Sequence, residues 1–330
     1  MVTLKDVAAA AKVSTVTASS VLSGSYRVRV AEETAARINK VAKELNYVPL
    51  ASAQGLKTGR TKMISFIAFP TRGKNFPAHV FETIQGIAEF TRSKGQKLLL
   101  NLTHDHTEQL ETARQLAFGR QVDGIIIQSA SGDDRAITGI LREAKRPYVI
   151  LENALPDCLS VCYDSEDIVR VLREEFIPGG GMVMVIPYGE WHPALREAEE
   201  KTKAWAATQD IPFAVWNGTG LPPVDWLVKN KQATSNGKIL LTMAGEQFSS
   251  FLDIVAKSGL ILGSNLRLVY MSDAESLLSP PNGVRLLRYN AYELGFRAAQ
   301  LLFQTIDGKK DEAPDKNGNY AGALVPALKS

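Results

Sequence analysis

The sequence has few cysteines and lacks any long uncharged apolar run. Its only two cysteines in 330 residues are Cys158 and Cys162, and their spacing matches no zinc signature, so we expect reduced, structural thiols. Lys5, Asp6 and Lys12 interrupt the first apolar stretch, and no later segment approaches the length that a bilayer requires. These absences argue against a signal peptide and a membrane span, and we expect a soluble, cytoplasmic protein.

Charge is concentrated at one end of the chain. Residues 1–60 contain nine Lys or Arg and four Asp or Glu, a net charge of +5, whereas the whole chain carries +3. The chain is 45% hydrophobic and 22% charged, which excludes a mainly disordered protein and allows one small and one large domain. A locally basic segment on a nearly neutral chain favours a nucleic-acid partner.

From Met63 onward, continuous apolar runs alternate with amphipathic helical patterns. This alternation predicts parallel, doubly wound sheets covered on both faces. About 270 residues exceed what one sheet comfortably holds, so we expect two lobes with a ligand between them, beyond the carboxyl ends of the strands. The predicted strands are MISFIAF from Met63, Lys97–Leu102, Val122–Gln128, Pro147–Asn153, Gly181–Pro187, Lys238–Met243 and Arg267–Ser272.

The first 46 residues predict three short helices. Thr3, with Asp6 three residues later, forms an approximate capping box that starts a helix at about Leu4. A tight turn at Lys12 and Val13 leads to Ser14, a second N-cap, so two helices are joined at the spacing of a helix-turn-helix. A third amphipathic helix is predicted over about Glu32 to Leu45. The expected core is Val7, Ala11, Val13, Ala18, Val21, Leu22, Ala36, Ile38, Val41, Ala42 and Leu45.

On such a unit the first residues of the second helix enter the major groove. Thr15, Val16 and Ser19 then lie near base edges and Thr17 near phosphate. A helical mini-domain without DNA affinity is the alternative, and the local basic charge argues against it.

Four stretches of this headpiece resemble the lactose/galactose repressor family of bacterial transcription regulators: TLKDVA, VSxxTxSxVL, RVxxxTxxRI and LNYVP, in order and at the family's spacing. TAS at Thr17–Ser19 with AxxGL further on is closer to the fructose and sucrose repressor branch. Lys12, Ser20, Leu50 and Gln54 depart from the usual Gly, Arg, Asn and Arg. The DNA-binding set that the resemblance implies is Thr3, Ser14, Thr15, Val16, Thr17, Ser19, Ser20, Ser23, Ala53, Leu56 and Lys57.

After Pro49 the segment ASAQGLKTG has modest helix propensity, which Gly55 weakens further. We expect it to be disordered alone and helical only on DNA. The resemblance implies a hinge helix, paired with that of the dimer mate, whose Leu56 is inserted as a wedge into a minor-groove step with Ala53 beside it. A plain flexible linker is the alternative.

The resemblance continues through VDGIII at Val122–Ile127, the strand and turn around Val161–Asp164 and YELGFRAAQLL at Tyr292–Leu302. It implies a two-lobed domain like that of periplasmic binding proteins. Sugar pockets need hydroxyl donors and acceptors plus an aromatic face. Candidates at predicted strand ends are Arg72, Phe76, His79, Ser129, Tyr163, Asp164, Trp191, Arg196 and Asp273. His104-Asp105-His106 lacks a further ligand and we expect no metal; Gly179–Gly181 predicts a tight turn rather than a phosphate loop.

We therefore predict a headpiece over 1–46, a hinge over 47–60 and an effector domain over 61–330, with lobe one at about 61–153 and 286–313 and lobe two at about 154–285 and 314–330. The expected function is a transcription repressor that binds operator DNA as a homodimer, possibly a tetramer, under control of a sugar or sugar phosphate, without a cofactor. A sugar receptor without DNA function would share the lobes but begin with a signal peptide. A sugar kinase or dehydrogenase would need a phosphate cradle or an acid/base pair, and neither motif is present.

Overall fold

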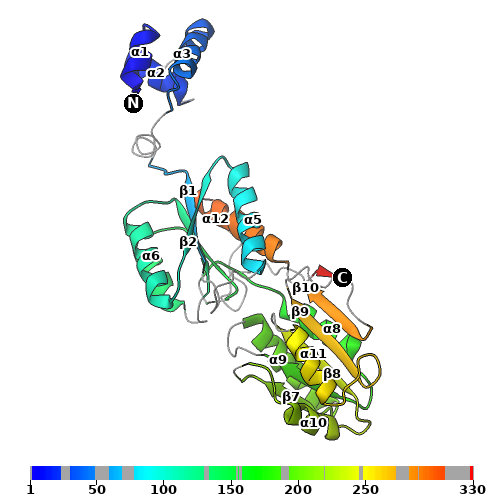
Figure 1. Ribbon diagram of the computed structural model, residues 1–330. Coiled ribbons are helices and arrows are strands. Elements are labelled where there is room, and N and C mark those ends of the chain that lie inside the picture. The colour runs from blue at the N-terminus through cyan, green and yellow to red at the C-terminus, as the bar shows by residue number, and fades with distance from the viewer. Residues whose placement is uncertain are drawn as a thin grey trace. The chain divides into compact units, whose positions relative to one another are not determined.

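The computed structural model separates into two compact units, Met1–Lys62 and Met63–Ser330, shown as ribbons in Figure 1. The structure describes residues 2–23, 30–48, 59–68, 78–129, 134–153, 155, 158–186, 193–218, 220–244, 248–272, 282–288, 290–308 and 328–329. Among the helices in these ranges, none is both long and apolar enough to cross a membrane.

The N-terminal unit is helical, as predicted. Its helices are α1 (Leu4–Ala10), α2 (Thr15–Leu22) and α3 (Glu32–Glu44). They pack around a small core whose fully or largely buried members are Val7, Ala8, Ala11, Ala18, Ile38 and Ala42. Ala36 is exposed, so its predicted burial is wrong. It lies about 200° around α3 from Ile38 and therefore off the inward stripe of residues spaced three and four apart.

The turn between α1 and α2 depends on an unusual backbone conformation at Lys12. Its φ of 52° lies in the left-handed region that glycine adopts without strain. The Lys12 amide donates to the Ala9 carbonyl at 3.1 Å and the Val13 amide donates to the Ala8 carbonyl at 3.0 Å, the hydrogen-bond pair of a Schellman motif. Arg37 Nε donates to the Ala11 carbonyl at 3.2 Å, which links α3 to this helix end.

The C-terminal unit contains two sheets, and the first has the strand order β2-β1-β3-β4-β5. All pairs of neighbouring strands in this sheet are parallel. Helices α5 and α12 cover one face, and α6 and α7 cover the other. The elements are β1 (Met63–Ala68), α5 (Ala78–Ser93), β2 (Lys97–Leu102), α6 (His106–Phe118), β3 (Gly124–Gln128), α7 (Arg135–Glu143), β4 (Tyr148–Leu151), β5 (Ser160–Val161) and α12 (Ala291–Ile306).

The second sheet has the order β11-β10-β9-β8-β6-β7, and only the pair of β10 with β11 is antiparallel. Helices α8 and α9 cover one face, and α10 and α11 cover the other. The elements are α8 (Ser165–Glu175), β6 (Gly181–Val185), α9 (Pro193–Thr208), β7 (Phe213–Trp216), α10 (Val224–Gln232), β8 (Ile239–Ala244), α11 (Phe248–Lys257), β9 (Leu266–Ser272), β10 (Val284–Arg288) and β11 (Leu328–Lys329). The predicted doubly wound, two-lobed architecture is confirmed.

All seven strands predicted from apolar runs are present. β7, β10 and β11 were missed, and β5 was expected only from the resemblance around Val161–Asp164. β7 and β11 have only four and two residues, and Arg285 and Arg288 interrupt the apolar pattern of β10. Strand pairing also locates the crossovers between the sheets. The predicted boundaries between the lobes lie after residue 153 and after residue 285. β5 (Ser160–Val161) follows the first boundary but still pairs with β4 in the first sheet, and β10 (Val284–Arg288) extends past the second boundary while it pairs with β9 in the second sheet.

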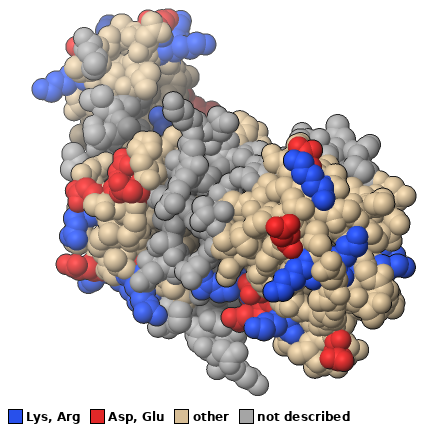
Figure 2. Space-filling view, turned by 60° about the horizontal axis from the view of Figure 1, so that its bottom comes forward, with Lys and Arg blue, Asp and Glu red and all other residues tan. Residues whose placement is uncertain are grey.

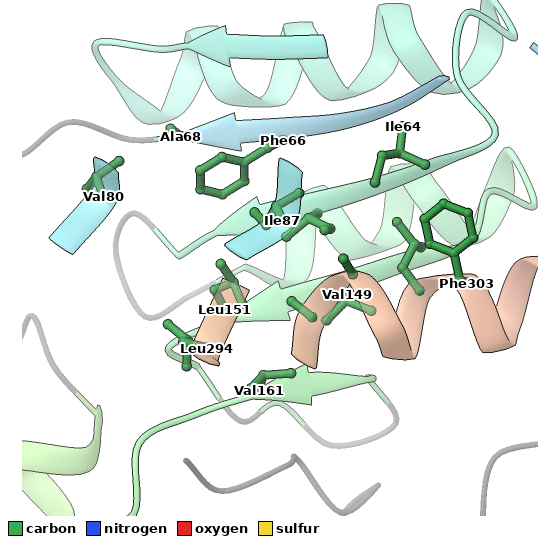
Figure 3. Packing of buried hydrophobic residues seen from close by; sticks show 14 of the residues in the cluster. Ile64, Phe66, Ala68, Val80, Ile87, Val149, Leu151, Val161, Leu294 and Phe303 are labelled. Atoms are coloured by element: carbon green, nitrogen blue, oxygen red, sulfur yellow. The ribbon is translucent and has the colours of Figure 1, made fainter. Parts of the chain in front are cut away.

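The last long helix, α12, returns to the first sheet and packs closely against α5. Figure 3 shows Val80 and Ile87 of α5 and Leu294 and Phe303 of α12 around a common core with Phe66 of β1. The two helices touch through backbone at two glycines. A Cβ on Gly86 would overlap the Tyr292 carbonyl oxygen, and one on Gly295 would overlap the Thr83 carbonyl oxygen. The contact therefore admits no side chain at either position.

We expect Gly86→Ala and Gly295→Ala each to destabilise the C-terminal unit by about 3 kcal/mol, because a methyl group must separate the two backbones. Urea denaturation of the full chain measures this as a lower midpoint. Gly139→Ala is the matched control. Gly139 lies in α7 with nothing within 4 Å of an added Cβ, so alanine should stabilise by up to about 1 kcal/mol. Unchanged midpoints for both α5 and α12 variants would refute the close contact.

Lys12→Gly should stabilise the N-terminal unit by about 0.5–1 kcal/mol, since glycine avoids the left-handed penalty but loses more entropy on folding. Hydrogen exchange at the Lys12 and Val13 amides in the full chain should slow accordingly. The same substitution at Lys40, inside α3, should instead destabilise by about 1 kcal/mol. Faster exchange in the Lys12 variant would contradict the proposed strain.

Candidate nucleic-acid interface and effector site

The start of α2 is held by a side-chain cap. Ser14 is extended, and its Oγ accepts from the Thr17 amide at 3.1 Å and lies 2.8 Å from Thr17 Oγ1. At α1, Thr3 Oγ1 accepts from the Asp6 amide at 3.4 Å, and Asp6 Oδ2 accepts from the Thr3 amide at 2.8 Å. The backbone hydrogen bond and then the side-chain hydrogen bond from Thr3 lower the pKa of Asp6. Both predicted caps are confirmed.

The first turn of α2 presents an exposed surface. Thr15 and Val16 are exposed, and the Val16 side chain is 66% exposed, although it is apolar. An exposed aliphatic group at this position can contact a thymine methyl, and the Thr15 hydroxyl can donate or accept at a base edge. Thr17 and Ser19 are half-buried beside them. The first turn of α2, here called the recognition surface because it is predicted to contact bases, therefore presents polar and apolar groups to solvent.

Ser20 does not share this surface. It is only 6% exposed and lies against the headpiece interior. Its burial separates it from the exposed residues of α2, and its inclusion in the DNA-binding set stays a prediction. The small serine fits an interior position where the arginine usual in the family would need a path to solvent.

The headpiece also exposes basic side chains. Lys5, Lys12 and Arg37 are exposed, and Arg37 also donates through Nε to the Ala11 carbonyl. Figure 2 shows Lys and Arg side chains projecting from the surface of the part of the chain that carries the headpiece. Exposed cations of this kind bind phosphate oxygens and position a domain on DNA without reading its sequence. The predicted hinge residues Ala53, Leu56 and Lys57, with Leu50 and Gln54, lie outside the described residues.

In the C-terminal unit, the predicted effector residues fall at strand and helix ends. Ser129 follows β3, and its amide donates to the Leu151 carbonyl at 3.2 Å. His79 is half-buried in the first turn of α5, and Arg196 is exposed in the first turn of α9. Tyr163 is 5% exposed and packs into the core of the first sheet. Arg72, Phe76, Trp191 and Asp273 lie outside the described residues.

Asp164 has a defined structural role as the N-cap of α8. Its Oδ1 accepts from the Glu166 amide at 2.8 Å. The cap uses one carboxylate oxygen, so Oδ2 is the atom that a ligand hydroxyl can reach. Because β3 and β5 belong to the same parallel sheet, Ser129 and Asp164 follow strands that end at the same edge. The structure thus places these two candidates on the edge where ligands of such sheets bind.

A buried polar network at this edge was missed by the sequence reasoning. Asn153 Nδ2 donates to Asp134 Oδ2 at 2.7 Å, and Gln109 Nε2 donates to the Gln128 carbonyl at 2.7 Å. Gln128 Nε2 donates to Glu152 Oε2 at 3.3 Å. Asp134 and Gln109 are fully buried. The available signal was that Gln128 ends one buried apolar strand and that Asn153 lies two residues after another.

The histidine motif has a structural explanation. Asp105 caps α6 by accepting from the Glu108 amide at 2.8 Å, and Glu108 Oε2 accepts from the His104 amide at 2.7 Å. His104 and His106 therefore flank a helix cap. Gly179 has a φ of 75° in the turn before β6, which confirms the predicted tight turn. Cys158 and Cys162 are both buried free thiols, and burial raises the pKa of Cys162 to about 12.

Comparison with known proteins agrees with this architecture. The model of the family described as "Bacterial regulatory proteins, lacI family" matches residues 3–50. The chain is 26% identical to the HTH-type transcriptional repressor PurR of Pasteurella multocida, over 94% of each protein. It is 27% identical to the Sucrose operon repressor of Klebsiella pneumoniae, over 98% of this chain and 97% of that one.

The fold is shared with a solved repressor. The Lac repressor dimer bound to operator and the anti-inducer ONPF has a TM-score of 0.75 with this chain at 19% identity, and the match covers 99% of this chain and 96% of that one. The capped helix-turn-helix, the two parallel sheets and the family match over the headpiece agree on one assignment. The headpiece, residues 3–50, matches the lacI family of bacterial regulatory proteins, and the chain is similar over nearly its whole length to transcriptional repressors.

Proposed function

We propose that this protein is a sequence-specific transcription repressor whose affinity for operator DNA is set by a sugar or sugar phosphate. The observation that carries the proposal is the exposed first turn of α2 on a helix-turn-helix within a basic segment. The relatives named above are transcriptional repressors, and we infer that this chain likewise acts as a regulator and not as an enzyme. A regulator of chromosomal genes works in the cytoplasm.

One headpiece reads only half of an operator, so the working form is a homodimer on a pseudo-palindromic site. The Lac repressor neighbour is named as a dimer on its operator. Phe81 of α5 and Leu100 and Leu102 of β2 are exposed apolar residues, 59%, 40% and 43% exposed, and a second copy would cover such residues. Leu56 of the hinge is the proposed minor-groove wedge in this complex.

The effector can act only through different affinities for the DNA-competent and DNA-incompetent arrangements of the protein. Its proposed ligands among the described residues are His79, Ser129, Tyr163, Asp164 and Arg196. Arg72, Phe76, Trp191 and Asp273, which lie outside the described residues, complete the proposed set. These groups provide hydroxyl, carboxylate, guanidinium and aromatic contacts, which suit a polyhydroxylated ring or its phosphate.

The test is selection of duplex DNA from a random pool by the full chain, followed by titration of the selected duplex with and without a panel of sugars and sugar phosphates. We expect one enriched pseudo-palindrome and at least one compound that changes its affinity tenfold or more. A pool without any enriched sequence would overturn the DNA-reading function. An enriched operator that no compound affects would overturn only the effector part.

Exchanging Thr15 and Val16 for other residues should change which base pairs are enriched, while affinity for nonspecific DNA and its salt dependence stay nearly unchanged, since phosphate contacts are retained. Repeating the selection with the double variant measures this. Lys5→Ala is the control, because loss of a cation should weaken binding to all sequences alike. The same enriched site in the double variant would show that α2 does not set the preference.

Asp164→Asn should weaken effector binding about tenfold or more, since the charge-assisted bond to a ligand hydroxyl is lost. Asparagine caps helices as well as aspartate does, so α8 and the stability of the unit should be retained. Asp273→Asn should have the same effect. Calorimetry with the compound found in the panel measures affinity, and operator binding without the compound should persist. Wild-type affinity in both variants would show that the pocket is placed wrongly.

A further inference from the structure

Lys201 of α9 joins its own helix to the start of α8. Its Nζ lies 2.6 Å from Glu166 Oε1 and 2.8 Å from Glu197 Oε1, and it donates to Ser165 Oγ at 3.0 Å. Glu197 is one turn earlier on α9, whereas Ser165 and Glu166 are the first two residues of α8. An ammonium group has three donors, and here three oxygens from two helices surround it.

This lysine is more constrained than an ordinary surface ion pair. Its side chain is only 32% exposed, and Ser165 is buried. Burial lowers the pKa of Lys201, but the hydrogen bonds to Glu166 and Glu197 outweigh it and raise the pKa overall. The hydrogen bond and the charge of Lys201 lower the pKa of Glu166. Lys201 and Glu166 therefore stabilise each other's charged forms.

The position of this cluster gives it a consequence beyond stability. Lys201 contacts the two residues that directly follow Asp164, and the amide of one of them, Glu166, donates to Asp164 Oδ1. Helices α8 and α9 pack together on the same face of the second sheet. Any rotation or slide of α8 against α9 would break the Lys201 contacts and would carry Asp164 with it.

We propose that Lys201 is a positioning residue of the effector site, which fixes the start of α8 against α9 and so holds the Asp164 carboxylate in place. Lys201 does not itself contact the effector in this proposal. The inference rests on the proposed function, because Asp164 is taken as an effector ligand. The position of Asp164 can be tested without any ligand, so the two ideas can fail separately.

The first experiment is hydrogen exchange on the full chain. Lys201→Met removes the charge but keeps the aliphatic stem, and we expect the amides of Glu166 and Asp167 to exchange about threefold faster or more, a change of the size that loss of ion pairs allows. Amides at the end of α8 should be unaffected. Lys201→Arg keeps the charge and should restore most of the protection.

Arg170→Met is the matched control. Arg170 makes two ion pairs, to Asp167 at 2.9 Å and to Glu174 at 3.0 Å, and the variant loses both. All three residues lie on α8, so these pairs do not join α8 to α9. It should leave the Glu166 amide protected. Equal exchange at Glu166 in wild type and Lys201→Met would overturn the proposal, and so would equal loss of protection in Lys201→Met and Arg170→Met.

The second experiment uses the sugar or sugar phosphate that the panel identifies. Lys201→Met should bind it about fivefold more weakly, with an unchanged melting temperature for the free protein, and Lys201→Arg should recover binding. Wild-type affinity in Lys201→Met despite faster exchange would overturn the link to the effector site. If no compound in the panel binds wild type, the effector part of the proposed function fails, and the exchange experiment still decides whether Lys201 positions Asp164.

Discussion

The close contact between the backbones of α5 and α12 at Gly86 and Gly295 is the constraint on which the C-terminal unit depends. The chain leaves the first sheet after β5, builds the second sheet, and then returns through α12 to cover a face of the first. Removal of α12 would expose Ile64, Phe66 and Val149, which are buried. The two sheets therefore belong to one unit because a helix at the end of the sequence completes the core of its beginning.

The headpiece depends on smaller interactions. Three short helices bury few large side chains, so caps and turns have a larger share in defining the structure. Thr3 and Ser14 cap α1 and α2, and Lys12 closes the turn between them in a left-handed conformation. These residues precede the first turn of α2 in the chain, so they fix its position without covering its outer surface.

The start of α8 combines structure and proposed function in the same atoms. Asp164 caps the helix with one carboxylate oxygen, and Lys201 ties the next two residues to α9. A capping carboxylate is already oriented and desolvated on one side, which lowers the entropy lost when it binds a ligand. Helix ends at the carboxyl edge of a parallel sheet provide such groups wherever a strand is followed directly by a helix.

The sequence by itself determined the helix-turn-helix, its caps, the doubly wound class and seven strands, because these follow from local periodicity, capping residues and apolar runs. It did not reveal the burial of Ser20 or the exposure of Ala36, since both depend on which face of a helix meets its neighbours. Short strands such as β7 form only because longer strands beside them offer free backbone groups. The glycine contact of α5 with α12, the network around Asp134 and Asn153, and the ties of Lys201 to α8 join residues far apart in the chain. Only the tertiary structure decided these, because no local pattern specifies a partner that packing brings together from a distance.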